Sequence, residues 1–446
     1  MTYSRAFGVA WSVSQAIRGR PERRMRRELE ASQYLAAEAL AALQWRRLER
    51  LLAHAYQWVP FYRARLDAAG LRPEAIRSWD DFRRLPELTR DDVRTRLPEL
   101  LSTRSERGVQ KTVTSGSTGV PLEFYQDENY LAFRRAARAR SQAWYGFARG
   151  DRLAMLSGSV RDVPQRSLRD QFFAALERQR WLSAFDMSEE RLSRFARGLE
   201  TWRPDFIVGY ASALHTLAQH VIRHGMAIRP KVVQSMAEQL WDFQRADIER
   251  AFGCPVIDFY GARESAPIAT QCLERNGLHV MADLRIVEIV DEEGHPAMPG
   301  EVGRVVVTDL TNYAMPLIRY ANDDLASWST EGPCRCGRTL PRLASIHGRS
   351  SDVIRTRDGT RMHGYYFMFL FYGAKGVEQF QVRQTSLETI EVLIKPAPDY
   401  REEFAGDVVR RIEQRTGGAF RVTCRLVDEI PLTPAGKRRF VLSDVA

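Results

Sequence analysis

Hydrophobic positions near the start of the chain recur at helical spacing. Leu40, Leu43, Leu48, Leu51 and Leu52 follow one another mostly at intervals of three to five residues, a pattern typical of amphipathic helices. The stretch Trp58–Tyr62 contains a proline and interrupts this pattern. We therefore expect a helical lead-in over residues 28–105, broken near residue 60.

Short apolar segments then alternate with helical ones. They occupy 111–114, 120–125, 205–208, 231–234 and 255–259, and a helical pattern covers 129–148. Buried strands separated by helices predict an α/β architecture of layered sheets. Residues 278–345 are strand-rich instead, with turns expected at Gly294 and Pro299–Gly300.

The last 95 or so residues have the pattern of a small α+β domain. We expect a helix near 365–372, strands near 377–384 and 387–394, a helix near 399–415 and a strand near 419–428. This divides the chain into an N-terminal domain over 1–348, a hinge over 349–352 and a C-terminal domain over 353–446.

Composition narrows the function classes. The 446 residues carry 66 Lys+Arg against 56 Asp+Glu, for a net charge of +10. The basic residues are dispersed rather than gathered in a stripe, so no nucleic-acid partner is expected. No apolar run is long enough for a transmembrane helix, no signal peptide is recognisable, and five cysteines do not form a disulfide framework. A cytoplasmic location is the expectation.

A run of small residues between two predicted strands could bind phosphate. It consists of Thr114, Ser115, Gly116, Ser117, Thr118 and Gly119. Glycines let the backbone approach an anion closely, and hydroxyl and amide groups can then surround phosphate oxygens. No Gly-Lys-Ser/Thr ends the run, so it is not a Walker A loop. A flexible loop without a ligand is the alternative.

Four more motifs follow in order. They are Asp258–Glu264, Arg319–Leu325, Gly348–Asp352 and Pro431–Lys437, and an N-terminal segment, Leu51–Tyr62, accompanies them. The series resembles the adenylate-forming superfamily of acyl-CoA synthetases and luciferases. Within it, the chain is most similar to the phenylacetate–CoA ligase family and its capsule-biosynthesis-type relatives, over nearly the whole length.

The resemblance implies a fold and a nucleotide site. The fold would be a large adenylate-forming domain with layered α/β sheets and a distorted β-barrel subdomain, followed by a small mobile domain. In the site, the 114–119 loop would hold the β- and γ-phosphates of ATP. The remaining implied roles are adenine-edge contact for Ala237 and Glu238, stacking on adenine for Tyr260 beside Asp258 and Gly261, ribose contact for Asp324 and Arg349, and Mg²⁺ binding for Glu264.

Lys437 is the candidate catalytic cation. A carboxylate that attacks the α-phosphate of ATP brings like charges together, so one cation must bridge the attacking oxygen and the developing phosphate charge. Lys437 follows Gly436 near the end of the small domain, as the superfamily pattern requires. The alternative is a surface lysine beside Arg438 and Arg439.

A second constellation has metal-ligand chemistry. Cys334 and Cys336 form a close pair, and Cys272 and His279 lie upstream. Three thiolates and an imidazole suit structural Zn²⁺ in a tetrahedral site. Some members of the family that the chain resembles have such a site. Free cysteines and a core histidine are the alternative. His215, His220 and His224 do not share one helical face, so no metal triad is expected from them.

The expected activity is ATP-dependent conversion of a carboxylic acid to an acyl-AMP, followed by transfer to coenzyme A. By resemblance the acid would be aryl or arylacetic, with Trp144, Tyr145, Gly209 and Tyr210 as candidates for its pocket. Transfer to an amine, adenylylation alone, or a non-catalytic nucleotide-binding scaffold in polysaccharide biosynthesis are the alternatives. A homodimer is one of the open oligomeric states.

Overall fold

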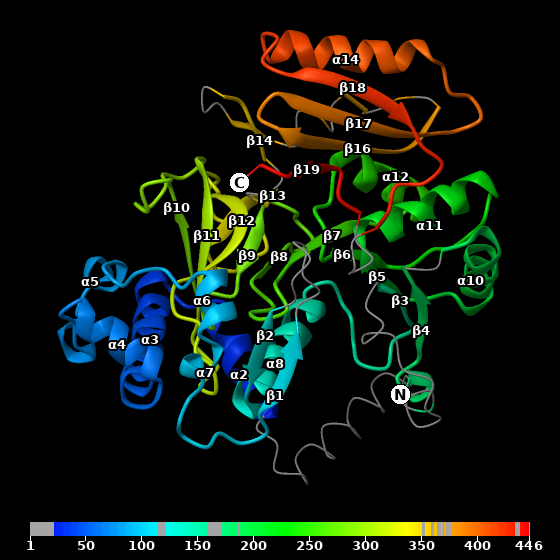
Figure 1. The fold of residues 1–446 in the computed structure, drawn as a ribbon. Helices are drawn as coiled ribbons and strands as arrows, with labels where there is room; N and C mark the ends of the chain where they lie inside the picture. The colour runs from blue at the N-terminus through cyan, green and yellow to red at the C-terminus, as the bar shows by residue number, and fades with distance from the viewer. Residues whose placement is uncertain are drawn as a thin grey trace.

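The computed structural model describes residues 22–113, 122–157, 172, 174–184, 187–349, 353–357, 361–363, 367, 370–371, 374, 376–432 and 438–445. Figure 1 shows the N-terminal helices, coloured blue, on one side of a large sheet, and a small orange and red sheet with one covering helix at the other end. Among the described residues, no helix is long and apolar enough to cross a membrane.

The lead-in is helical, as the leucine spacing predicts. Leu40, Leu48, Leu51 and Leu52 are buried on α3, which ends just before Val59, and Pro60 then begins the next helix. Proline suits the first turn of a helix, where its missing N–H has no partner to lose. The helices are α2 (Glu22–Ser32), α3 (Ala37–Trp58), α4 (Pro60–Ala68), η1 (Pro73–Ala75), α5 (Trp79–Arg83), α6 (Arg90–Thr95) and α7 (Leu97–Leu100).

One eleven-stranded sheet forms the centre of the molecule, in the order β10-β11-β12-β13-β9-β8-β7-β6-β5-β3-β4. Its strands are β3 (Leu153–Ser157), β4 (Gln179–Ser183), β5 (Phe206–Tyr210), β6 (Val232–Met236), β7 (Val256–Tyr260), β8 (Ala269–Thr270), β9 (Leu278–Val280), β10 (Arg285–Val290), β11 (Val302–Asp309), β12 (Tyr320–Trp328) and β13 (Arg342–Arg349). Strands β3 to β7 pair in parallel, and β7 to β13 pair antiparallel. The strand-rich region expected over residues 278–345 is therefore continuous with the parallel strands in one sheet.

The parallel half is covered on both faces, which explains its uninterrupted apolar strands. Along β3, Leu153 and Met155 belong to one core cluster, whereas Ala154 and Leu156 belong to another. The second cluster contains the apolar faces of α10 (Glu189–Trp202), α11 (Ala211–Arg223) and α12 (Asp242–Phe252). A separate hairpin of β1 (Gln110–Val113) and β2 (Glu123–Gln126) precedes α8 (Glu128–Ala143).

The C-terminal part has its own sheet and core. Its order is β18-β17-β16-β19, and α14 covers the face turned away from the large sheet (Figure 1). Its elements are β14 (Val353–Arg355), β15 (Arg361–His363), β16 (Val377–Ser386), β17 (Thr389–Pro396), α14 (Glu403–Arg415), β18 (Arg421–Leu426) and β19 (Val441–Ser443). Trp241, from the segment before α12, belongs to this core cluster together with Phe380 and Val392. The small domain therefore rests on the loop that follows β6.

Candidate active site

The predicted adenine-binding residues lie along one edge of the large sheet. Strands β5, β6 and β7 are parallel neighbours, with Tyr210 opposite Met236 and Met236 opposite Phe259. Their carboxyl ends therefore bring Ala237 and Tyr260 to the same edge. Open α/β sheets bind ligands at the carboxyl ends of their strands, so this edge is the candidate nucleotide site.

Tyr260 and Asp324 are directly bonded, although 64 positions separate them in the sequence. The Tyr260 hydroxyl donates a 2.8 Å hydrogen bond to Oδ2 of Asp324. Nδ2 of Asn322 donates to both, at 2.8 Å to the phenol oxygen and 2.9 Å to the carboxylate. Burial, reinforced by the negative charge of Asp324, raises the pKa of Tyr260 well above its ordinary value, so the phenol stays a donor. The aromatic ring and the carboxylate are thus held as one unit.

Arg349 completes this group from the neighbouring strand. Asp324 on β12 is the register partner of Arg349 on β13, and Nε of Arg349 lies 3.5 Å from Oδ1 of Asp324. Both predicted ribose residues therefore stand side by side. Asn322 was not among the sequence candidates. Its position two residues before Asp324 on the same strand, and hence on the same face, was the signal that could have identified it.

Glu264 is a buried carboxylate with both positively and negatively charged side chains near it. Its side chain is 5% exposed. Burial raises the pKa of Glu264, and Asp324 raises it further, whereas the positive charges of Arg90 and Arg349 oppose the rise. Arg90, which sequence reasoning missed because it lies 174 positions away at the start of α6, also pairs with Asp323 at 3.3 Å. A carboxylate so placed is a hard oxygen ligand suited to Mg²⁺.

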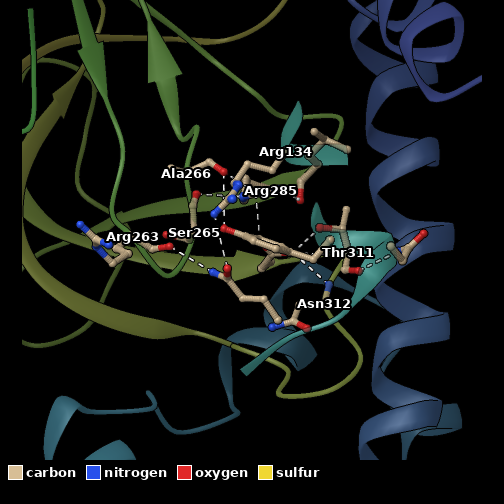
Figure 2. A network of polar contacts seen from close by, with 12 residues as sticks. Arg134, Arg263, Ser265, Ala266, Arg285, Thr311 and Asn312 are labelled. Carbon is tan, nitrogen blue, oxygen red and sulfur yellow. Dashed lines mark hydrogen bonds and ion pairs between the residues drawn. The ribbon is translucent and has the colours of Figure 1, made fainter. Parts of the chain in front are cut away.

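A network of side chains from distant strands fixes the loop that carries Glu264 (Figure 2). Arg285, fully buried, donates from Nε to the Ser265 carbonyl at 3.1 Å and from Nη2 to the Ala266 carbonyl at 3.3 Å. It is itself neutralised by Asp309, 3.1 Å away. Gln126 of β2 donates to the Arg263 carbonyl at 3.1 Å. The carbonyls on both sides of Glu264 are thus occupied by side chains, which leaves its backbone little freedom.

Gly261 allows the same loop to fold back tightly. A Cβ at this position would lie 3.0 Å from Cβ of Ala266 and 3.2 Å from Cε1 of Phe259. Such contacts are shorter than van der Waals distance, so a larger residue would push the Glu264 loop outward. The glycine of this motif therefore has a packing role that is visible in the structure.

Ala237 and Glu238 join the sheet edge to the small domain. Ala237 has φ of +67°, a left-handed conformation that non-glycine residues seldom adopt and that concentrates at functional sites. Oε2 of Glu238 accepts from the Ser212 amide at 2.8 Å, at the start of α11. Oε1 of Glu238 accepts from the Arg438 amide at 3.0 Å. One carboxylate thus contacts both domains.

Two candidate elements lie outside the described residues. The first is the loop from Thr114 to Gly119, which is flanked by the paired strands β1 and β2. The second is Lys437, whose neighbour in the chain, Arg438, is the residue bonded to Glu238. Their predicted roles in phosphate binding and catalysis stay predictions.

The four candidates for the acid pocket have different surroundings. Tyr210 is buried at the end of β5, beside the candidate nucleotide edge. Gly209 is required by packing, because a Cβ there would lie 2.8 Å from Leu156. Tyr145 is buried and belongs to the same core cluster as Trp144. Trp144 is buried and donates from Nε1 to Gln33 at 2.8 Å, and the acid-pocket role of all four residues stays a prediction.

The four predicted metal ligands converge. All their donor atoms lie within 4.8 Å of one another. Sγ of Cys272 is 3.6 Å from Sγ of Cys334, and Sγ of Cys336 is 3.3 Å from Nε2 of His279. Zinc bonds of about 2.3 Å to sulfur and 2.0–2.1 Å to nitrogen place tetrahedral ligands about 3.5–3.8 Å apart. The spacing of this set therefore fits a zinc ion.

The surroundings of the cluster favour the metal-binding form of its histidine. Burial lowers the pKa of His279 to about 4, which keeps its imidazole neutral. Nδ1 of His279 lies 3.3 Å from the Leu340 carbonyl, the outer contact that commonly orients a metal-binding histidine. The Trp144 ring meets His279 edge to face at 5.6 Å, and the Arg338 guanidinium lies 4.5 Å over the same indole. Trp144 is thus part of the wall around the cluster.

Comparisons with known proteins identify relatives of this chain. Residues 354–444 match the family model of the CapK C-terminal domain. The chain is 28% identical to phenylacetate-coenzyme A ligase of Thermus thermophilus over 92% of this chain and 97% of that protein. It is 30% identical to phenylacetate-coenzyme A ligase of Escherichia coli over 74% of this chain and 76% of that protein.

A solved structure has the same fold. It is 2-hydroxyisobutyryl-CoA ligase in the postadenylation state, with a TM-score of 0.74, 22% identity, and coverage of 92% of this chain and 91% of that one. The thioesterification state of the same ligase aligns with a TM-score of 0.59. The predicted fold class, a large α/β domain followed by a small C-terminal domain, is confirmed.

Proposed function

Because the chain belongs to the phenylacetate–coenzyme A ligase family, we propose that it activates a carboxylic acid with ATP and transfers the acyl group to coenzyme A. In the first step, an acid oxygen bonds to the α-phosphorus of ATP and pyrophosphate leaves. In the second, the thiolate sulfur of coenzyme A bonds to the acyl carbon and AMP leaves. An aryl or arylacetic acid is the substrate class that we favour, from the relatives' names.

The observation that carries this proposal is the bonded group of Tyr260, Asp324 and Arg349 beside Glu264. An aromatic face is suited to adenine, and a carboxylate with lone pairs to spare beside a guanidinium donor is suited to the ribose hydroxyls. Tyr260 and Asp324 fix each other at 2.8 Å. Binding therefore requires little rearrangement, which lowers the entropic cost of orienting the nucleotide.

Glu264 is the residue proposed to hold Mg²⁺. The residues present fit this ion, since one buried carboxylate with phosphate oxygens and water is a common Mg²⁺ environment. When bound, the ion would neutralise negative charge on the phosphates. The protein's own part is to keep Glu264 in place, and the contacts of Arg285 and Gln126 to its neighbours support that role.

Lys437 is proposed to stabilise the charge that develops as the acid attacks the α-phosphate. The predicted hinge, residues 349–352, would let the small domain rotate afterwards, since the lysine and the incoming thiol need the same space. The Glu238–Arg438 hydrogen bond supports this assignment, because it ties the residue after Lys437 to the candidate adenine edge.

The Cys272, His279, Cys334 and Cys336 set is proposed to hold structural Zn²⁺. It joins β9 to the segments before it and before β13. A closed site with four protein ligands has no open position for substrate, so its contribution would be to stability.

A panel of acids tests the proposed function. Pyrophosphate release would be measured for aryl, arylacetic and short hydroxy acids, each with no acceptor, with coenzyme A, and with an amine. We expect release with at least one acid and formation of its thioester with coenzyme A. A product formed only with the amine would reassign the chain as an amide ligase. No release with any acid would favour a nucleotide-binding scaffold and reject the proposal.

A further inference from the structure

A second group of metal-ligating side chains lies on the helical layer beside the parallel strands. His220 lies in the last turn of α11, His224 is the residue that caps the C-terminus of this helix, and Glu189 lies in the first turn of α10. One donor atom from each lies within 4.8 Å of the other two. The two imidazole rings are 4.3 Å apart between centroids. Residues spaced by four share a helical face, and here that face meets a carboxylate.

The donor atoms have the spacing that a metal ion imposes. Oε1 of Glu189 lies 3.2 Å from Nδ1 of His220 and 3.4 Å from Nε2 of His224. Bonds of about 2.0–2.1 Å to zinc place two tetrahedral ligands about 3.4 Å apart. Two of the three separations already match. The His224 side chain is 47% exposed, so it is free to rotate and close the third.

The buried Nδ1 of His220 faces Oε1 of Glu189 at 3.2 Å without a hydrogen bond. The side chain is 3% exposed, and Nδ1 accepts or donates no hydrogen bond within the described part of the chain. Nε2 lies 3.4 Å from Oγ of Ser193. If Nε2 carries the proton for this contact, the lone pair of Nδ1 faces the carboxylate of Glu189. Two electron-rich atoms 3.2 Å apart repel unless a cation lies between them.

We propose that Glu189, His220 and His224 bind a divalent transition-metal ion of the Zn²⁺, Ni²⁺ or Cu²⁺ class. Two imidazoles and one carboxylate are the ligand chemistry that these ions prefer over Mg²⁺ or Ca²⁺. Ser193 is the outer contact that would orient the ring of His220. The exposure of Glu189 and His224 leaves a coordination position open to water.

The site is distinct from the cysteine cluster and from the nucleotide edge. It would clamp the start of α10 to the end of α11, two helices that otherwise meet through apolar contacts. The third histidine of α11 does not take part, because His215 pairs with Asp247 at 2.8 Å. The sequence expectation concerned the three histidines alone, and the carboxylate from α10 could not be foreseen from it.

Ni²⁺ and Zn²⁺ titrations of the full-length protein by calorimetry test the site. We expect His224→Ala and Glu189→Gln to weaken Ni²⁺ binding by about 10-fold or more, since even outer contacts of a metal site contribute 10–100-fold. His215→Ala is the matched control on the same helix and should bind as the wild type does. Cys336→Ser distinguishes Ni²⁺ binding at this site from Ni²⁺ binding at the cysteine cluster. The Ni²⁺ affinity of the Glu189, His220 and His224 site should be unchanged in this variant.

Thermal unfolding gives a second readout. Ni²⁺ should raise the melting temperature of the wild type and of His215→Ala, but not of His224→Ala, because an ion stabilises only the state that binds it. The side chains of His224 and Glu189 are exposed, so the His224→Ala and Glu189→Gln variants should fold. Equal Ni²⁺ affinities in the wild type, His224→Ala and Glu189→Gln would overturn the proposal and leave a proton-dependent ion pair as the explanation of the cluster.

Discussion

The backbone amide of Arg438 donates a 3.0 Å hydrogen bond to Oε1 of Glu238, across 200 positions of sequence. The carboxylate of Glu238 is shared between two backbone amides, because its other oxygen, Oε2, accepts from the Ser212 amide at 2.8 Å. Trp241, three residues further on, is buried in the core of the small domain. The loop after β6 therefore binds the small domain through both polar and apolar contacts, next to the candidate nucleotide edge.

Glu238→Gln should slow the adenylation step more than the thioester step. A glutamine amide can accept from only one of the two backbone N–H groups, and hydrogen bonds to charged groups contribute about 1.5–3 kcal/mol. We expect ATP–pyrophosphate exchange to fall about 10-fold, while transfer from supplied acyl-AMP to coenzyme A stays within about threefold. Glu378→Gln, a glutamate of the small domain paired with Lys395, is the control. An equal loss in both steps would contradict a role confined to the adenylation arrangement.

Lys437→Ala should lower the adenylation rate by on the order of 10²-fold or more, the usual effect of removing one group that stabilises transition-state charge. ATP–pyrophosphate exchange is the measurement. Lys395→Ala is the matched control, since this lysine lies on the same small domain and pairs with Glu378 at 2.7 Å. The assignment fails if the Lys437 variant exchanges pyrophosphate at the wild-type rate.

Cys336→Ser should release the metal proposed for the cysteine cluster and lower the melting temperature. Removing a ligand leaves the buried Cys272 and Cys334 as close, unbridged sulfurs, and a structural ion stabilises only the folded state. Metal content after dialysis and thermal unfolding are the measurements. Cys424→Ser, a partly buried cysteine of the small domain, should keep the metal. Wild-type metal content in both variants would show that the cluster binds no ion.

Asp258→Asn should stabilise the protein at neutral pH. Burial raises the pKa of Asp258 to about 6, only partly opposed by Arg245, whereas an unfolded aspartate titrates near 3.9. The folded state therefore binds the proton more tightly, so this group's stabilising effect is complete below about pH 4 and is lost as the pH rises through 6.

Asparagine imitates the protonated form at every pH. We expect the free energy of unfolding of Asp258→Asn to exceed that of the wild type by about 1–3 kcal/mol at pH 7, and the difference to vanish near pH 4. Urea unfolding at both pH values measures this. Asp242→Asn, an exposed aspartate of α12, controls for the loss of an aspartate as such. A difference of the same size at both pH values would refute the assignment.

Much of the fold was predictable because its signals are local. Alternating or continuous apolar runs mark β5, β6, β7, β10 and β11, and leucine spacing marks α3. The family was predictable because ordered motifs survive in the sequence. The pairing order of the large sheet was not, since strand neighbours are selected by packing across the whole domain.

The site was predictable only where motifs name its residues. Tyr260 and Asp324 come from two motifs, but their 2.8 Å hydrogen bond follows from β7 and β12 meeting in space. Arg90, Gln126 and Arg285 have no motif around them. Each reaches the site through a contact across many positions of sequence, and a single sequence contains no record of such distances.

Arg349 is the final residue of β13 and the first residue of the predicted hinge. It is also the partner of Asp324, both in the strand register and in an ion pair. The proposed ribose contact and the predicted pivot of the small domain therefore meet at one residue of the backbone. A rotation of the small domain would therefore move the side chain proposed to contact the ribose. Nucleotide binding and domain rotation would be coupled through this single residue, without a chain of intermediate residues.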